Sequence, residues 1–200
     1  VYNTPGNHDY SGTADNATLY RRLGMPDAYY TFTQKGWKFI VLNTNEVASY
    51  ANPDVTLQKE LAQMQERIRT EGRSNGAEWN GGISRKQMEW LRNELAKAQR
   101  KDERVIVLAH HPVYPTNGLT ALNDTEIVEL LGRFPAVKAF INGHHHPGAF
   151  GRTGHIPFVT TEGMIETESE NAYGVVEVFD DRIVIQGRGR TRSYTLPFEN

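Results

Sequence analysis

Cysteine is absent from this sequence of 200 residues, which excludes disulfide bonds, thiolate metal sites and a cysteine nucleophile. Long apolar runs are also missing, because no stretch approaches the roughly 18 residues that a membrane-spanning helix needs. There is little surplus charge, since 22 basic and 24 acidic residues give a net charge of −2. We therefore expect no nucleic-acid partner and no membrane association. The lack of cysteine leaves the compartment open between cytoplasm and periplasm.

Apolar residues make up 38% of the chain and aromatic residues 10%, enough to build a buried core. No internal repeat, low-complexity tract or linker divides the sequence, so we expect a single domain over residues 1–200. Continuous apolar runs predict buried strands at 38–43, 104–109 and 136–141. Helical spacing predicts helices that start after Asp54 and Ser84 and another over 124–131, and a hairpin is expected at 174–186. Alternating strands and helices indicate an α/β fold.

Histidines follow two of these predicted strands directly. His110 comes after the strand at 104–109, and the triplet His144 to His146 follows the strand at 136–141 through Asn142 and Gly143. A further histidine, His8, lies in a turn-like segment near the start. Taken singly, these could be a core histidine, a solvated surface run and an ordinary turn. Together, at the strand ends where open α/β sheets bind ligands, they favour a metal site.

Three motifs resemble the C-terminal motifs of calcineurin-like metallophosphoesterases. They are Gly-Asn-His-Asp at 6–9, His-x-Pro at 110–112 and Gly-His-x-His at 143–146. Segments 79–84, 162–167 and 187–190 also resemble the manganese-dependent ADP-ribose/CDP-alcohol diphosphatase branch of that family. The resemblance implies a mixed β-sandwich flanked by helices.

The resemblance also implies roles for individual residues. Asn7, His110 and His144 would bind the second of two divalent metal ions, and His146 the first. His8 would act on the scissile phosphate as a general acid or transition-state donor. Manganese is favoured by the branch, while iron, zinc and cobalt stay open because these ligands do not choose among first-row metals.

Substrate-lining candidates are polar or aromatic residues near these motifs or in the branch-like segments. They are Tyr10, Asn80, His111, Tyr114, Phe150 and Glu162. His111 and His145 fall at variable positions of the motifs, which makes them lining residues rather than ligands. For the aromatic candidates the alternative is ordinary packing, and for Tyr114 packing is slightly favoured.

Two motifs that the family places upstream, Asp-x-His and Gly-Asp-x-x-Asp, do not occur in this sequence. They would supply the carboxylate that bridges both metals. We therefore expect the C-terminal portion of a longer enzyme that lacks its N-terminal strands, and expect this chain alone to be inactive. The alternative is a natural, inactive short form. Missing strands would also expose a sheet edge, through which copies of the chain could self-associate.

The expected function is hydrolysis of phosphoester or pyrophosphate bonds by a dinuclear metal centre. Small nucleoside diphosphate-linked substrates such as ADP-ribose or CDP-alcohols are favoured by the branch. Alternatives are a cyclic-nucleotide phosphodiesterase or phosphomonoesterase of the same superfamily, and an inactive truncated module. Adventitious metal binding by the histidines is a further alternative, which predicts that His145 matters as much as its two neighbours.

Overall fold

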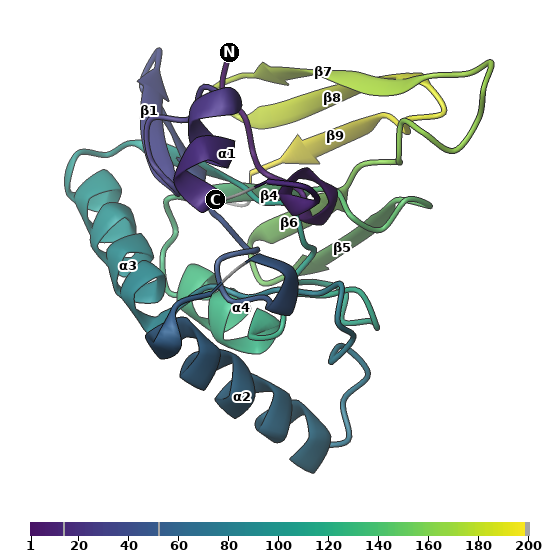
Figure 1. Ribbon diagram of the computed structural model, residues 1–200. Helices are drawn as coiled ribbons and strands as arrows, with labels where there is room; N and C mark the ends of the chain where they lie inside the picture. The colour runs from purple at the N-terminus through teal and green to yellow at the C-terminus, as the bar shows by residue number, and fades with distance from the viewer. Residues whose placement is uncertain (14, 52, 199–200) are drawn as a thin grey trace.

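The computed structural model contains two β-sheets that stack face to face, with helices on the outer side of the larger sheet (Figure 1). The structure describes residues 1–13, 15–51 and 53–198. The helices are α1 Asn16–Arg22, α2 Val55–Thr70, α3 Arg85–Arg100 and α4 Asp124–Gly132, with 3-10 turns η1 Asn7–Tyr10 and η2 Ser49–Ala51. The strands are β1 Tyr30–Gln34, β2 Trp37–Val41, β3 Arg104–Leu108, β4 Val137–Asn142, β5 Ala149–Thr153, β6 Ile156–Thr160, β7 Ala172–Val178, β8 Arg182–Gly189 and β9 Tyr194–Pro197.

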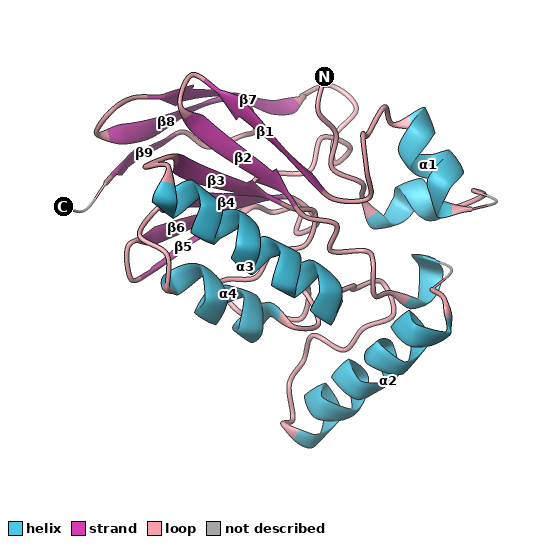
Figure 2. Cartoon of the chain, turned by 90° about the vertical axis from the view of Figure 1, so that its left-hand side faces the viewer, coloured by secondary structure: helices cyan, strands magenta, loops and turns pink. Residues whose placement is uncertain are grey.

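The larger sheet has six strands in the order β1-β2-β3-β4-β6-β5. Its four inner strands are parallel, and β1 and β5 are antiparallel edges. The smaller sheet has the antiparallel order β7-β8-β9. Figure 2 shows the resulting layers, with the small sheet, the large sheet and then α3 and α4. The predicted α/β class, with a mixed sheet sandwich flanked by helices, is confirmed.

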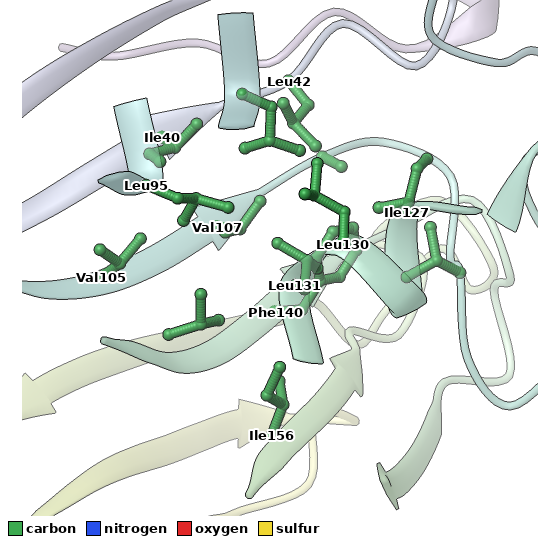
Figure 3. Close-up of a cluster of buried hydrophobic side chains, with 14 of the residues drawn as sticks. Ile40, Leu42, Leu95, Val105, Val107, Ile127, Leu130, Leu131, Phe140 and Ile156 are labelled. Atoms are coloured by element: carbon green, nitrogen blue, oxygen red, sulfur yellow. The ribbon is translucent and has the colours of Figure 1, made fainter. Parts of the chain in front are cut away.

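Side chains alternate between two cores along each inner strand. On the helix side, Val105, Val107 and Phe140 pack with Leu95 of α3 and Leu131 of α4 (Figure 3). On the other side, the intervening residues face the small sheet and pack in a second cluster of Trp37, Ile106, Ala139, Val159, Ile183, Ile185 and Leu196. A strand that is covered on both faces must be apolar throughout, which is why these strands read as continuous apolar runs.

Predicted helix starts are confirmed by the capping contacts. The Asp54 side chain accepts hydrogen bonds from the backbone N–H groups of Thr56 and Leu57. The Ser84 hydroxyl accepts one from the N–H of Gln87. These side chains satisfy amide donors that have no partner within the first turn of a helix.

Several elements were not predicted, namely α1, β1, β5, β6 and β9. In β6 the cause is Pro157, because proline cannot donate a ladder hydrogen bond. The structure tolerates it since the pairing of β6 with β4 begins only at Phe158. None of the helices in the described part of the chain is long and apolar enough to cross a membrane.

The small sheet ends in a strand that is open to solvent. Among the described residues β7 pairs with β8 alone, and Tyr173, Val175 and Val176 are 52%, 49% and 43% exposed. Val176 lies directly opposite Ile185, which is buried between the sheets. An exposed edge thus lies in the small sheet, while the edges of the large sheet are the antiparallel strands β1 and β5.

A buried ion pair joins the large sheet to α3. The Lys38 ammonium lies 2.5 Å from a Glu94 carboxylate oxygen, and both side chains are about nine-tenths buried. Lys97 contacts the other oxygen of the same carboxylate at 2.6 Å. The pair satisfies two charges that would otherwise lie unpaired under the helix layer.

Replacing Glu94 with alanine should lower the free energy of unfolding by about 3 kcal/mol, because the Lys38 charge would stay buried without its partner. Urea denaturation followed by circular dichroism measures this loss. Glu66→Ala is the matched control, since the Glu66–Arg69 pair is exposed and should contribute much less to stability. Equal losses in the two variants would contradict this account.

Candidate metal centre

The C-terminal ends of β3 and β4 bring two of the predicted ligands together. His110 follows β3 after one residue, and His144 follows β4 after Gly143. The Gly143 N–H donates a 3.0 Å hydrogen bond to the His110 carbonyl, which ties the two loops together. The imidazole rings lie 4.9 Å apart between centroids. Neighbouring parallel strands end at the same edge of a sheet, so the fold itself creates this pairing.

A third predicted ligand comes from η1 at the start of the chain. The Asn7 side-chain oxygen lies 2.9 Å from Nε2 of His110. Asn45 holds this segment in place by donating a 2.6 Å hydrogen bond to the Pro5 carbonyl. Gly6 lets it approach closely, since a Cβ there would lie 3.0 Å from Cε1 of His110.

Three potential ligand atoms therefore meet at His110, because Asn7 Oδ1 and His144 Nδ1 both lie within hydrogen-bond distance of His110 Nε2. The two nitrogens are 3.0 Å apart. Nitrogen and oxygen donors of this kind suit a divalent first-row metal. His144 adopts a left-handed backbone conformation with φ of 66°, which is uncommon for a residue with a side chain.

Burial keeps these imidazoles neutral. It lowers the pKa of His110 to about 3, with nearby His144, His8 and His146 adding to the shift. It lowers the pKa of His144 to about 4, again with His146 and His8 contributing. A neutral imidazole has a lone pair to offer a metal, whereas a protonated one does not. The residues present thus offer a divalent cation closely spaced ligand atoms and unprotonated imidazole nitrogens.

His146 and His8 lie beside this cluster, close enough to shift its pKa values. Nδ1 of His146 is hydrogen-bonded to the Glu166 carboxylate, so Nε2 is the ring nitrogen left for a second metal. His8 is exposed, next to Asn7 on η1. The structure therefore brings together all five residues predicted for metal binding and catalysis.

The ring of His111 lies next to those of His110 and His144, but its nitrogens bond to other partners. Its side chain is fully buried, and both ring nitrogens have partners. Nδ1 lies 2.9 Å from the Thr44 hydroxyl, and Nε2 lies 3.3 Å from the Trp79 carbonyl oxygen. These contacts also correct the expectation that His111 lines the substrate pocket.

Three further lining candidates are buried and already engaged, so the structure does not support direct substrate contact for them. Tyr10 donates to Asn43 Oδ1 at 3.2 Å, and burial raises the pKa of its hydroxyl. Asn80 contacts His144 and two backbone carbonyls. Glu162 is paired with Arg192 at 3.1 Å.

The two remaining lining candidates differ in exposure. Tyr114 is half-buried and packs on Phe158 with 5.4 Å between ring centroids, which fits the packing alternative. Phe150 is 43% exposed and stacks on Tyr194 with 5.2 Å between centroids. Phe150 thus stays a candidate for substrate contact.

Glu166 is a site residue to which sequence reasoning gave no role. It lies on a loop, twenty residues beyond His146, and its carboxylate bonds to the His146 ring. The one signal in the sequence was its place in segment 162–167, which resembles the diphosphatase branch. Gly163 permits the loop to pass the imidazole, since a Cβ there would lie 2.6 Å from the His146 ring.

The fold and the converging ligand atoms define a metal-binding α/β protein with its site at the ends of parallel strands. The chain matches the calcineurin-like phosphoesterase family over residues 1–148, and it belongs to that family. The resemblance seen in the motifs is thereby confirmed.

Curated relatives are named manganese-dependent ADP-ribose/CDP-alcohol diphosphatases. The Xenopus laevis protein is 34% identical over 127 residues, which cover 61% of this chain and 36% of that protein. The Homo sapiens protein is 33% identical over 121 residues, covering 56% and 34%. The Oryza sativa subsp. japonica protein matches 100% of this chain and 68% of its own length at 25% identity. The chain spans about a third of the length of the two vertebrate relatives.

Among solved structures, a dimetal phosphatase from Danio rerio superposes with a TM-score of 0.87 at 23% identity. The match covers 100% of this chain and 72% of that one. This likeness confirms the fold.

In the metal-free chain the free energy of unfolding should fall as the pH is lowered from 7 to 5. Unfolded histidines take up protons near pH 6.5, whereas His110, His111 and His144 stay neutral in the folded state. Their stabilising contribution is fully present above pH 6.5 and is lost on acidification, at up to about 1.4 kcal/mol per pH unit for each. Denaturation in EDTA at several pH values measures the slope.

His110→Asn should flatten this slope. His155→Asn should keep it, because His155 lies outside the cluster, against the Phe134 carbonyl. An unchanged slope in His110→Asn would refute the neutral-imidazole account.

Proposed function

We propose that this chain binds divalent cations, with manganese favoured. We propose further that it is part of a phosphohydrolase that cleaves pyrophosphate bonds of nucleoside diphosphate-linked substrates. ADP-ribose and CDP-alcohols are the substrates suggested by the names of the relatives. The observation that carries the proposal is the convergence of Asn7, His110 and His144 on one point, with neutral imidazoles.

The position of each residue determines its proposed role. Asn7, His110 and His144 would hold one metal, and His146 would contribute to the other. Two bound divalent ions lower the pKa of a water and neutralise phosphate charge. His8 is exposed beside Asn7, where it can donate a proton to the leaving oxygen. The exposed face of Phe150 offers a stacking surface for a nucleobase.

Charge balance sets a condition on activity. The side chains proposed as ligands, Asn7, His110, His144 and His146, are all neutral and include no carboxylate. Two divalent ions would bring about +4 of charge, which neutral ligands do not offset. We propose that the chain is the C-terminal portion of the catalytic domain, and that turnover needs carboxylates from Asp-x-His and Gly-Asp-x-x-Asp segments of a longer form or a partner chain.

Manganese-stimulated hydrolysis of ADP-ribose tests this proposal, on the 200-residue chain and on a longer form that carries both motifs. We expect turnover in the longer form, and His8→Ala there should lower kcat by roughly 10²–10⁴-fold with metal content unchanged. His145→Ala is the control and should keep full activity. If His145→Ala lost as much metal as His144→Ala, adventitious histidine binding would replace this proposal.

A substrate panel separates the alternatives within the superfamily. Faster turnover of cyclic nucleotides or phosphomonoesters than of ADP-ribose would favour a phosphodiesterase or phosphomonoesterase, since surrounding loops decide specificity. No turnover of any phosphoester by either form would favour an inactive module.

The open edge of β7 favours one partner of this chain, a second copy. Antiparallel pairing of two β7 strands about Val175 would set Glu177 of one copy opposite Tyr173 of the other, so no like charges meet. The exposed Val175 and Val176 side chains would then be covered.

Sedimentation velocity tests self-association of the 200-residue chain. We expect a concentration-dependent dimer that Val175→Lys shifts to monomer, since lysine on an edge strand opposes pairing. Val55→Lys adds the same charge at an exposed valine on α2 and should leave the dimer intact. A monomer at all concentrations would rule out this interface.

A further inference from the structure

Asn80 has a buried side-chain amide that contacts His144, one of the predicted metal ligands. It is 2% exposed and lies on the loop between α2 and α3. Its side-chain nitrogen donates 2.9 Å hydrogen bonds to the carbonyl oxygens of Asn75 and Gly118. Its side-chain oxygen lies 3.1 Å from Nε2 of His144.

These contacts fix the orientation of the Asn80 amide, and this orientation in turn fixes which ring nitrogen of His144 carries the proton. The two carbonyl oxygens can only accept, so the amide nitrogen must face them and the amide oxygen must face His144. That oxygen can also only accept, so Nε2 of His144 must carry the hydrogen. Nδ1 is then the unprotonated nitrogen, and it lies 3.0 Å from His110 Nε2, at the point where the ligand atoms converge.

We propose that Asn80 is a positioning residue that holds His144 as the Nε2–H tautomer and thereby aims the Nδ1 lone pair at the metal. Hydrogen bonds of this kind to the far nitrogen of a ligating histidine fix both its tautomer and its ring orientation. The tautomer follows from the contacts of Asn80 alone, while its effect on metal affinity rests on the proposed metal-binding function.

The surroundings of Asn80 hold it in this position. The buried His111 bonds to the carbonyl of Trp79, the preceding residue. Gly81, the next residue, passes so near the Thr44 carbonyl oxygen that a Cβ would lie 2.4 Å from it. His111 and Thr44 are themselves joined, so both flanks of Asn80 are anchored to one buried contact. This gives His111 a supporting role, through the loop that carries Asn80.

The ring-nitrogen chemical shifts of His144 test the tautomer directly, in the metal-free chain labelled with ¹⁵N. We expect Nε2 protonated and Nδ1 unprotonated in the parent. Asn80→Ala should yield a mixture of tautomers. A parent chain with Nδ1 protonated would overturn the inference, and this holds even if Asn80→Ala fails to fold.

Calorimetric titration with Mn²⁺ alone tests the consequence. Asn80→Ala should weaken binding by roughly 10–100-fold. Asn75→Ala is the matched control, since it removes a neighbouring loop anchor to Ala121 without touching His144, and should keep both tautomer and affinity. Equal weakening in Asn75→Ala and Asn80→Ala would reduce Asn80 to a structural role and overturn the inference.

Failure of the positioning role of Asn80 can be distinguished from failure of the proposed metal-binding function. If Asn80→Ala scrambles the tautomer and Mn²⁺ binds neither parent nor variant, the positioning role stands and the proposed metal function fails. If Mn²⁺ binds the parent but the tautomer does not respond to Asn80→Ala, the positioning role fails and the metal function stands.

Discussion

Imidazoles crowded at one edge of a sheet can coexist only if they stay neutral, and the rest of the site depends on this constraint. The rings of His110, His111 and His144 lie 4.3–4.9 Å apart between centroids. Two positive charges at such distances in a buried setting would repel strongly. Desolvation pushes the pKa values of all three below the ordinary range. The same burial that prevents protonation leaves lone pairs free, which is what a cation requires of its ligands.

The constraint assigns different tasks to neighbouring histidines. Thr44 and Trp79 engage both ring nitrogens of His111, so this buried histidine has a structural role. His110 and His144 each turn a nitrogen toward the common point. A separate polar contact joins η1 to α3, because Asn43 bonds both the Tyr10 hydroxyl and the Gln87 amide.

Much of the scaffold could be predicted from the sequence, because periodicity reports burial. The apolar runs that became β3 and β4 indicated strands covered on both faces, and the histidines behind them indicated the site. Strand β6 was missed because Pro157 broke the pattern, and β1 because half of it is exposed.

Roles that depend on long-range contacts were beyond reach. Asn80 and Glu162 were predicted to touch substrate because they lie in segments that resemble the diphosphatase branch. Their burial and partners are set by loops 30 to 64 residues away in sequence. A local pattern shows that a residue is unusual, but only the fold shows whether it faces substrate or supports a ligand.

Anomalous diffraction from crystals soaked in Mn²⁺ tests the central claim most directly. The account predicts a manganese peak bounded by Asn7 Oδ1, His110 Nε2 and His144 Nδ1, with His111 outside the coordination shell. A peak held by His111 or His145 instead, or no peak in the presence of Mn²⁺, would contradict it.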